Sequence, residues 1–102
     1  MKDDKYQIKT IKGLIMTIYE VILSQVSVFT VTKIVNTIED ILVNSSFNIS
    51  EENLFLRILD CIDELKKRNY VAASYENTYV VISSENALKT LEDDYEDKLS
   101  RE

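Results

Sequence analysis

The chain has 102 residues, 45% of them hydrophobic and 29% charged, so residues 1–102 can bury one hydrophobic core and are expected to form one domain. No apolar run approaches the roughly 18 residues that span a bilayer, so we expect no membrane insertion. The N-terminal segment MKDDKYQIKTIKG mixes acids with lysines and has no small-residue cleavage site, so it is not typical of a secretory signal. The lone Cys61 cannot form an intramolecular disulfide, and together these features predict a cytoplasmic protein.

The charge is unevenly distributed along the chain. The net charge is −6, and the segment from Ser84 onward carries seven acidic and three basic side chains. A protein that binds nucleic acid normally presents a basic surface, because phosphate neutralisation supplies most of the affinity. Any basic surface on this chain must therefore be a local patch on an acidic body.

Three helices are predicted in the first two thirds of the chain. The first spans about residues 4–25, where apolar side chains recur at three- and four-residue steps. The short β-branched segment 27–31 predicts a strand, and Thr30 or Thr32 can then cap a second helix over about 31–43. The Asn- and Ser-rich segment 43–50 predicts a loop. Ser50, followed by two acids, starts a third helix over about 50–68, with a buried stripe formed by Leu54, Ile58, Cys61, Ile62 and Leu65.

The pattern then changes to that of strands. YVAASY and TYVVIS flank Glu76 and Asn77 and predict a hairpin over 70–83, because Asn tolerates the left-handed conformation that a tight turn needs. We expect Val71, Val80 and Ile82 on its buried side. A last helix over about 84–99 carries Leu88, Leu91 and Tyr95 at helical spacing.

This order of elements, with LKKRNYV leading into the hairpin and SSENALKTL following it, resembles the winged helix-turn-helix superfamily. More narrowly, it is similar to the small dimeric regulators of the MarR and PadR type found in archaea, bacteria and their viruses. The resemblance implies an α+β, mostly helical fold and a transcription regulator that binds duplex DNA as a dimer. It also implies that the third helix enters the major groove while the hairpin, the wing, touches the backbone or the minor groove.

The residues offer little to catalysis. The chain contains no His, so it has no imidazole base, and its single Cys excludes a multi-thiolate zinc site. Its one glycine, Gly13, lies within a predicted helix, so there is no phosphate-cradling loop. The adjacent acidic pairs fall at helix ends or on solvent faces. We therefore expect neither an enzyme nor a bound metal or cofactor.

The candidate DNA contacts follow from the predicted third helix and wing. Asn53 and Arg57 have the side chains that read adenine and guanine, and Asn77 lies at the wing tip. Phosphate contacts are expected from the basic end of the helix: Lys66, Lys67 and Arg68. The start of the first helix adds a second lysine cluster: Lys2, Lys5, Lys9 and Lys12.

The same helix also favours an alternative. Its outward face is mostly acidic and carries Leu56, which suits a protein partner better than phosphate. The alternative is a winged-helix protein-interaction module, or an accessory subunit of a nucleic-acid machine, without direct DNA binding.

A homodimer is expected because the first and last helices carry more apolar surface than one small core would cover. Leu88, Leu91 and Tyr95 form a stripe as narrow as a coiled-coil seam, and Leu14 extends the apolar surface of the first helix beyond one face. Two subunits that pack these helices about a two-fold axis would bury both. The alternative is a monomer in which the last helix folds back over the first.

Overall fold

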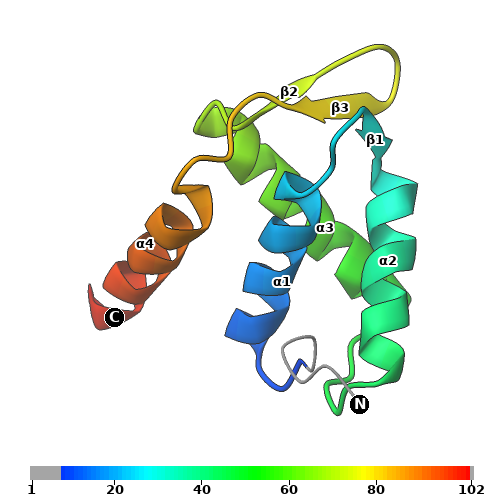
Figure 1. Cartoon of the computed structure of the whole chain (residues 1–102). Helices are drawn as coiled ribbons and strands as arrows, with labels where there is room; N and C mark the ends of the chain where they lie inside the picture. The colour runs from blue at the N-terminus through cyan, green and yellow to red at the C-terminus, as the bar shows by residue number, and fades with distance from the viewer. Residues whose placement is uncertain (1–7, 102) are drawn as a thin grey trace.

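The computed structural model describes the backbone of residues 8–101 and the side chains of residues 8–98. It contains four helices and one small antiparallel sheet, which confirms the predicted α+β class (Figure 1). The elements follow the chain as α1 (Ile11–Leu23), β1 (Phe29–Thr30), α2 (Val31–Val43), α3 (Glu51–Lys67), β2 (Val71–Ala73), β3 (Thr78–Val81) and α4 (Ala87–Arg101).

Helix α1 begins later than the sequence predicted. Its N-cap is Thr10, whose side-chain oxygen accepts a hydrogen bond from the Gly13 N–H. The expected start between residues 4 and 10 is therefore wrong over residues 8–10, and residues 4–7 lie outside the described part. Ile8 is nevertheless buried, and its backbone N–H donates to Ser45 Oγ at 2.9 Å. The apolar side chains that recur at helical spacing do not all point inward, because Ile11 in the first turn remains 38% exposed.

Helices α2 and α3 match their predicted ranges closely. Thr30 caps α2 by accepting from the Lys33 N–H, and Ser50 caps α3 by accepting from the Asn53 N–H. Each cap satisfies one of the backbone donors that a helix start leaves without a partner. The five residues predicted as the stripe of α3 are all buried: Leu54, Ile58, Cys61, Ile62 and Leu65.

The predicted hairpin is present and gains a third strand. The strand order is β1-β3-β2, with β3 antiparallel to both neighbours, so the short strand before α2 pairs with the hairpin. The sheet lies across one end of the bundle formed by α1, α2 and α3 (Figure 1). One face of the sheet covers the helices, and Val71 on that face is 2% exposed.

Two details of the hairpin differ from the prediction. Asn77 lies in the turn as expected, but the left-handed backbone belongs to Glu76, with φ of 54°. Ile82 was expected on the buried side and is 59% exposed, while Val80 is half-buried. The alternation of a strand explains this, because Val80 and Ile82 share the face opposite to Tyr79 and Val81.

Helix α4 packs against the side of the bundle rather than extending away from it. It begins at Ala87, three residues later than predicted, after Asn86 with φ of 58°. Ala87 and Leu91 join the core shared by α1, α2 and α3, with exposed fractions of 0% and 3%. Helix α4 thus belongs to the same hydrophobic core as the other three helices.

Candidate interaction surfaces

The outward face of α3 is acidic with an apolar centre, close to the sequence prediction. Phe55 and Leu56 are adjacent large hydrophobic side chains that are 44% and 51% exposed, so together they form an apolar patch on the surface. Exposed carboxylates flank them on the same helix. We define the α3 face as Glu51, Glu52, Phe55, Leu56, Asp60 and Asp63, all of which are exposed.

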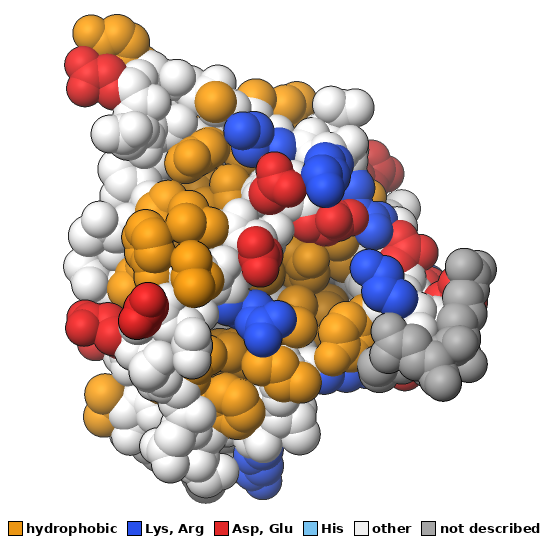
Figure 2. Space-filling view, turned by 180° about the vertical axis from the view of Figure 1, so that it is seen from behind, with side chains coloured by type: hydrophobic (Ala, Val, Ile, Leu, Met, Phe, Trp, Pro, Cys, Tyr) orange, Lys and Arg blue, Asp and Glu red, His pale blue; other side chains and the backbone are white. Residues whose placement is uncertain are grey.

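A hollow beside Phe55 widens this face toward α2. It has a volume of about 430 Å³ and is lined by Thr32, Val35, Asn36, Glu51, Glu52 and Phe55. Figure 2 views this side of the molecule and shows hydrophobic side chains gathered together with acidic ones beside them. Phe55 was not predicted from the sequence. Its position, one residue after the buried Leu54, places it about 100° around the helix, at the margin of the buried stripe.

One of the three expected phosphate contacts at the end of α3, Arg68, is engaged within the chain. Arg68 Nε donates to Glu64 Oε2 at 2.7 Å, and its Nη1 donates to Asp94 Oδ2 of α4 at 2.6 Å. Burial alone would lower the pKa of Arg68, but the hydrogen bonds to the two carboxylates outweigh burial and raise it. Arg68 therefore links α3 to α4, and its charge is compensated at short range.

The two lysines beside it are more exposed. Lys67 Nζ lies 3.4 Å from Asp63 Oδ2, and both side chains are more than 60% exposed. Lys66 Nζ lies 5.9 Å from the centre of the Tyr79 ring. Such exposed contacts are weak, so both ammonium groups remain accessible to a ligand.

The expected base contacts do not join these lysines in one basic surface. Asn53 is exposed in the first turn of α3, but Asp60 and Asp63 lie between it and Lys67 along the exposed side. Arg57 is half-buried and faces α1 and α4 instead. Asn77 is exposed at the hairpin turn, where its neighbour Glu76 is acidic.

Arg57 contributes to a cleft between α1, α3 and α4. The cleft has a volume of about 180 Å³, with Ile15, Tyr19, Cys61, Leu91 and Tyr95 as its apolar lining. Acidic and basic side chains alternate around an apolar floor on this side of the molecule (Figure 2). The charged lining consists of Arg57, Asp60, Glu64, Arg68, Asp94 and Lys98.

Burial makes two side chains of this cleft weaker acids. Burial raises the pKa of the Cys61 thiol to about 12, and burial also raises the pKa of the Tyr19 hydroxyl. Both groups therefore stay protonated at neutral pH, whereas a nucleophilic thiol needs a lowered pKa. The described residues also contain no group of three side chains that could hold a metal ion.

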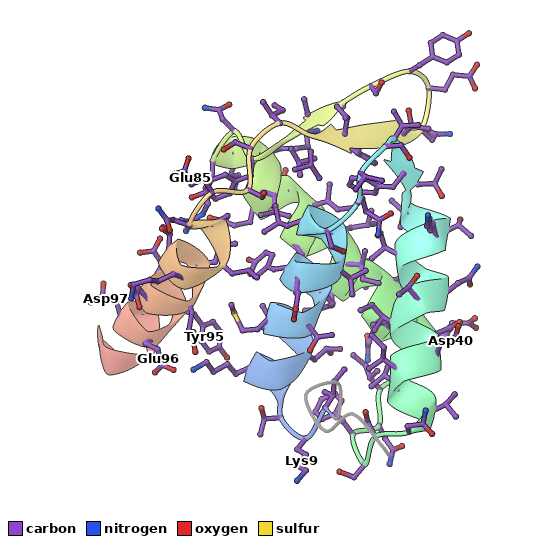
Figure 3. The ribbon with its side chains drawn as sticks, viewed as in Figure 1. Lys9, Asp40, Glu85, Tyr95, Glu96 and Asp97 are labelled. Atoms are coloured by element: carbon purple, nitrogen blue, oxygen red, sulfur yellow. The ribbon has the colours of Figure 1, made fainter. Side chains whose placement is uncertain are left out.

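The residues expected at a dimer interface are mostly used within one chain. Leu14 and Leu91 are 0% and 3% exposed, and Leu88 packs against the same core. Tyr95 is half-buried on the side of α4 that faces α1, while Asp97 points away (Figure 3). Leu14 and Leu91 are thus covered within one chain and are not surface residues.

Ion pairs join α4 to both α3 and α1. The pair between Arg68 and Asp94 joins it to α3, and Lys12 joins it to α1. Lys12 of α1 lies 3.2 Å from Glu92 and also contacts Glu96, so this member of the expected lysine cluster is paired within the chain. The hydrogen bonds to Glu96 and Glu92 raise the pKa of Lys12. Lys9 is exposed and points away from the bundle (Figure 3), and Lys2 and Lys5 lie outside the described residues.

Compared with models of protein families, with curated proteins and with solved structures, the chain matches none of them. Within the described residues, every helix is too short or too polar to cross a membrane.

Proposed function

We propose that this protein is a winged-helix interaction module without catalytic activity, and that it binds a partner protein through the α3 face. The observation that carries the proposal is the exposure of Phe55 and Leu56 among four carboxylates. Apolar side chains at the centre of a charged rim are the usual anatomy of a protein–protein interface. The proposal includes a cytoplasmic location, since a lone buried cysteine suits a reducing compartment.

The charge of this face defines the chemistry of the partner. A complementary surface would present Lys or Arg side chains around one or two apolar side chains, because opposite charges across an interface favour association. An amphipathic helix with basic flanks meets this description and would place its apolar residues over Phe55 and Leu56, beside the hollow toward α2.

Duplex DNA fits the same face poorly. A helix in the major groove lies between two phosphate backbones, and the carboxylates of Glu52, Asp60 and Asp63 would be brought close to them. Arg68, expected as a phosphate contact, is held by Glu64 and Asp94. DNA binding would therefore have to overcome repulsion between these carboxylates and the phosphates, with few basic side chains that are not already paired.

A DNA-binding regulator remains the second candidate because of the order of the elements. Two helices, a hairpin whose sheet gains a strand from before α2, and accessible Lys66 and Lys67 at the end of α3 are what a winged-helix regulator would use. This candidate requires contacts from the lysine side of the molecule rather than from the middle of α3.

The two candidates are separated by binding experiments with defined probes. One probe is a synthetic amphipathic peptide with lysines around two leucines, and its control carries glutamates in place of the lysines. The other probe is a duplex of about 30 base pairs at about 50 mM salt, where phosphate contacts are strongest. Chemical-shift mapping by NMR reports which surface each probe touches.

We expect the basic peptide to shift resonances of residues 51–63 and the acidic peptide to shift none. Phe55→Ser with Leu56→Ser should abolish peptide binding, while Val43→Ser, which changes another exposed apolar residue, should preserve it. Peptide shifts confined to the acidic face of α4 would contradict the proposal. Duplex binding that weakens in Lys67→Ala, with a salt slope reduced by about 1, would establish the second candidate instead.

A further inference from the structure

The outer face of the sheet is uncovered in the structure. The pairs Ala72↔Val80 and Thr30↔Thr78 place four side chains on the same side, opposite to the buried Phe29 and Val71. Val28 and Ile82, which continue β1 and β3, are 51% and 59% exposed. In Figure 1 the helices lie below the sheet, and nothing lies over its upper side. We define the outer sheet face as Val28, Thr30, Ala72, Thr78, Val80 and Ile82.

This face lies in the least charged part of the protein. Residues 24–32, 69–75 and 77–84 contain no charged side chain, although 29% of the whole chain is charged. The nearest exception is Glu76 at the tip of the hairpin. A solvated sheet face normally carries polar or charged residues at every second position, and edge strands commonly carry lysines that prevent association. The outer sheet face carries two threonines, but it has no charged side chain and no lysine.

We propose that a second copy of this chain covers the outer sheet face, so that two sheets stack about a two-fold axis. A two-fold axis brings each face onto itself, which requires a surface that does not repel its own copy. Each chain carries a net charge of −6, so contacts between two copies of the α3 face or of α4 would oppose carboxylates. The outer sheet face places no charged side chain at the contact.

The shape of the face suits stacking of this kind. Ala72 and the two threonines are small, and the valine and isoleucine side chains rise beside them, so facing sheets can approach to about 10 Å and interdigitate. The interface uses neither α3 nor α4. It therefore leaves the α3 face of each copy open to a partner, and it does not depend on the proposed function.

The extent of the face sets the strength of the dimer. A standard interface involves about 20–30 residues on each side, and the outer sheet face with its immediate neighbours is smaller. We therefore expect a dimer that forms in the micromolar range and dissociates on dilution.

Sedimentation velocity of the full chain from about 5 to about 500 µM tests the proposal by mass action. The wild type should shift from monomer to dimer across this range. Ile82→Glu and Val28→Glu should each weaken association by at least about tenfold, because each buries two facing carboxylates in the dimer. Both side chains are already exposed in the monomer, so the fold should tolerate the change. The control is Val43→Glu, at a 79% exposed position in the last turn of α2, the end of that helix far from the sheet (Figure 1). It should dimerise like the wild type.

Two results would overturn the proposal. One is a dimer whose affinity is the same in Ile82→Glu and in the wild type, which would place the contact elsewhere. The other is a wild type that stays monomeric at the highest concentration. If that monomer co-sediments with uncharged phosphatidylcholine vesicles and Ile82→Glu does not, the outer sheet face binds a lipid surface instead.

Discussion

Replacement of Arg68 by Ala tests whether this side chain fastens α4 to the bundle. The substitution removes the hydrogen bonds to Glu64 and Asp94, which are 2.7 and 2.6 Å long. Hydrogen bonds that involve charged groups contribute about 1.5–3 kcal/mol when buried, and exposed ion pairs contribute about 0–1 kcal/mol. The Arg68 side chain is 27% exposed and its partners are 35% and 51% exposed. The contacts are therefore neither fully buried nor fully exposed, and their energies should fall between the two ranges. We expect a loss of about 1–2 kcal/mol in the free energy of unfolding for both contacts together.

Urea and thermal unfolding monitored by circular dichroism measure this loss. For a domain of about 100 residues, the Tm should fall by roughly 4–8 °C per kcal/mol. Lys67→Ala is the matched control, because its ion pair with Asp63 is longer, at 3.4 Å, and far more exposed. The control should lose less than about 0.5 kcal/mol. The gap between the two variants should narrow at about 1 M salt, since screening weakens partly exposed charge pairs.

Equal losses in the two variants would refute the reasoning. So would an Arg68→Ala variant of unchanged stability that binds duplex DNA less well, because Arg68 would then act on phosphate and not on α4. A double-mutant cycle with Asp94→Ala isolates the contact between the helices and should give a coupling of at least about 0.5 kcal/mol.

Three further expectations concern stability. Glu76→Gly should raise the free energy of unfolding by about 0.5–1 kcal/mol in urea titrations, because Glu76 has a φ of 54°; a destabilised variant would contradict this. Leu91→Ala should lower it by about 2–4 kcal/mol, since Leu91 is 3% exposed in the core; a loss below about 1 kcal/mol would show that α4 is not docked as described. Between about pH 9 and 12 the wild type should lose stability. Burial raises the pKa of Cys61 from 9.0 to about 12, so the unfolded chain releases this proton first. Cys61→Ala should flatten that decline in urea midpoints measured across the range, although the raised pKa of Tyr19 contributes in the same direction; an unchanged slope would exclude Cys61 as a cause.

The elements could be predicted because local signals and burial agree in this chain. Thr30 and Ser50 are cap residues placed directly before amphipathic segments, and both cap the helices predicted there. The hairpin followed from two runs of strand-like residues around a short polar turn. The start of α1 was predicted too early because the apolar spacing extends back to Ile8, while the capping hydrogen bond of Thr10 begins the helix at Ile11.

The surfaces were harder to predict because they depend on contacts between distant segments. The helical spacing places Leu91 on an apolar stripe. It does not show whether α1 of the same chain or α1 of a second chain covers that stripe. The same holds for Arg68, whose partner Asp94 lies 26 residues away. Phe55 was missed since helical spacing places it at the edge of the buried stripe, and only the course of α2 decides its exposure. The outward position of Leu56 and the acidic character of the face around it needed no such information and were predicted correctly.

The two-residue strand β1 has a consequence for how the protein folds. Its pairs, Phe29↔Tyr79 and Thr30↔Thr78, join positions about 50 residues apart, whereas β2 and β3 are neighbours in the chain. Closing so long a loop costs more conformational entropy than closing a hairpin, and contacts distant in sequence slow folding. The hairpin and the packing of α2 on α3 can therefore form before β1 attaches, and attachment of β1 fixes the direction in which α1 enters the core. In native-state hydrogen exchange, the backbone amides of β1 should open at a lower free energy than those of the hairpin, so the strand that completes the sheet is also the first to leave it.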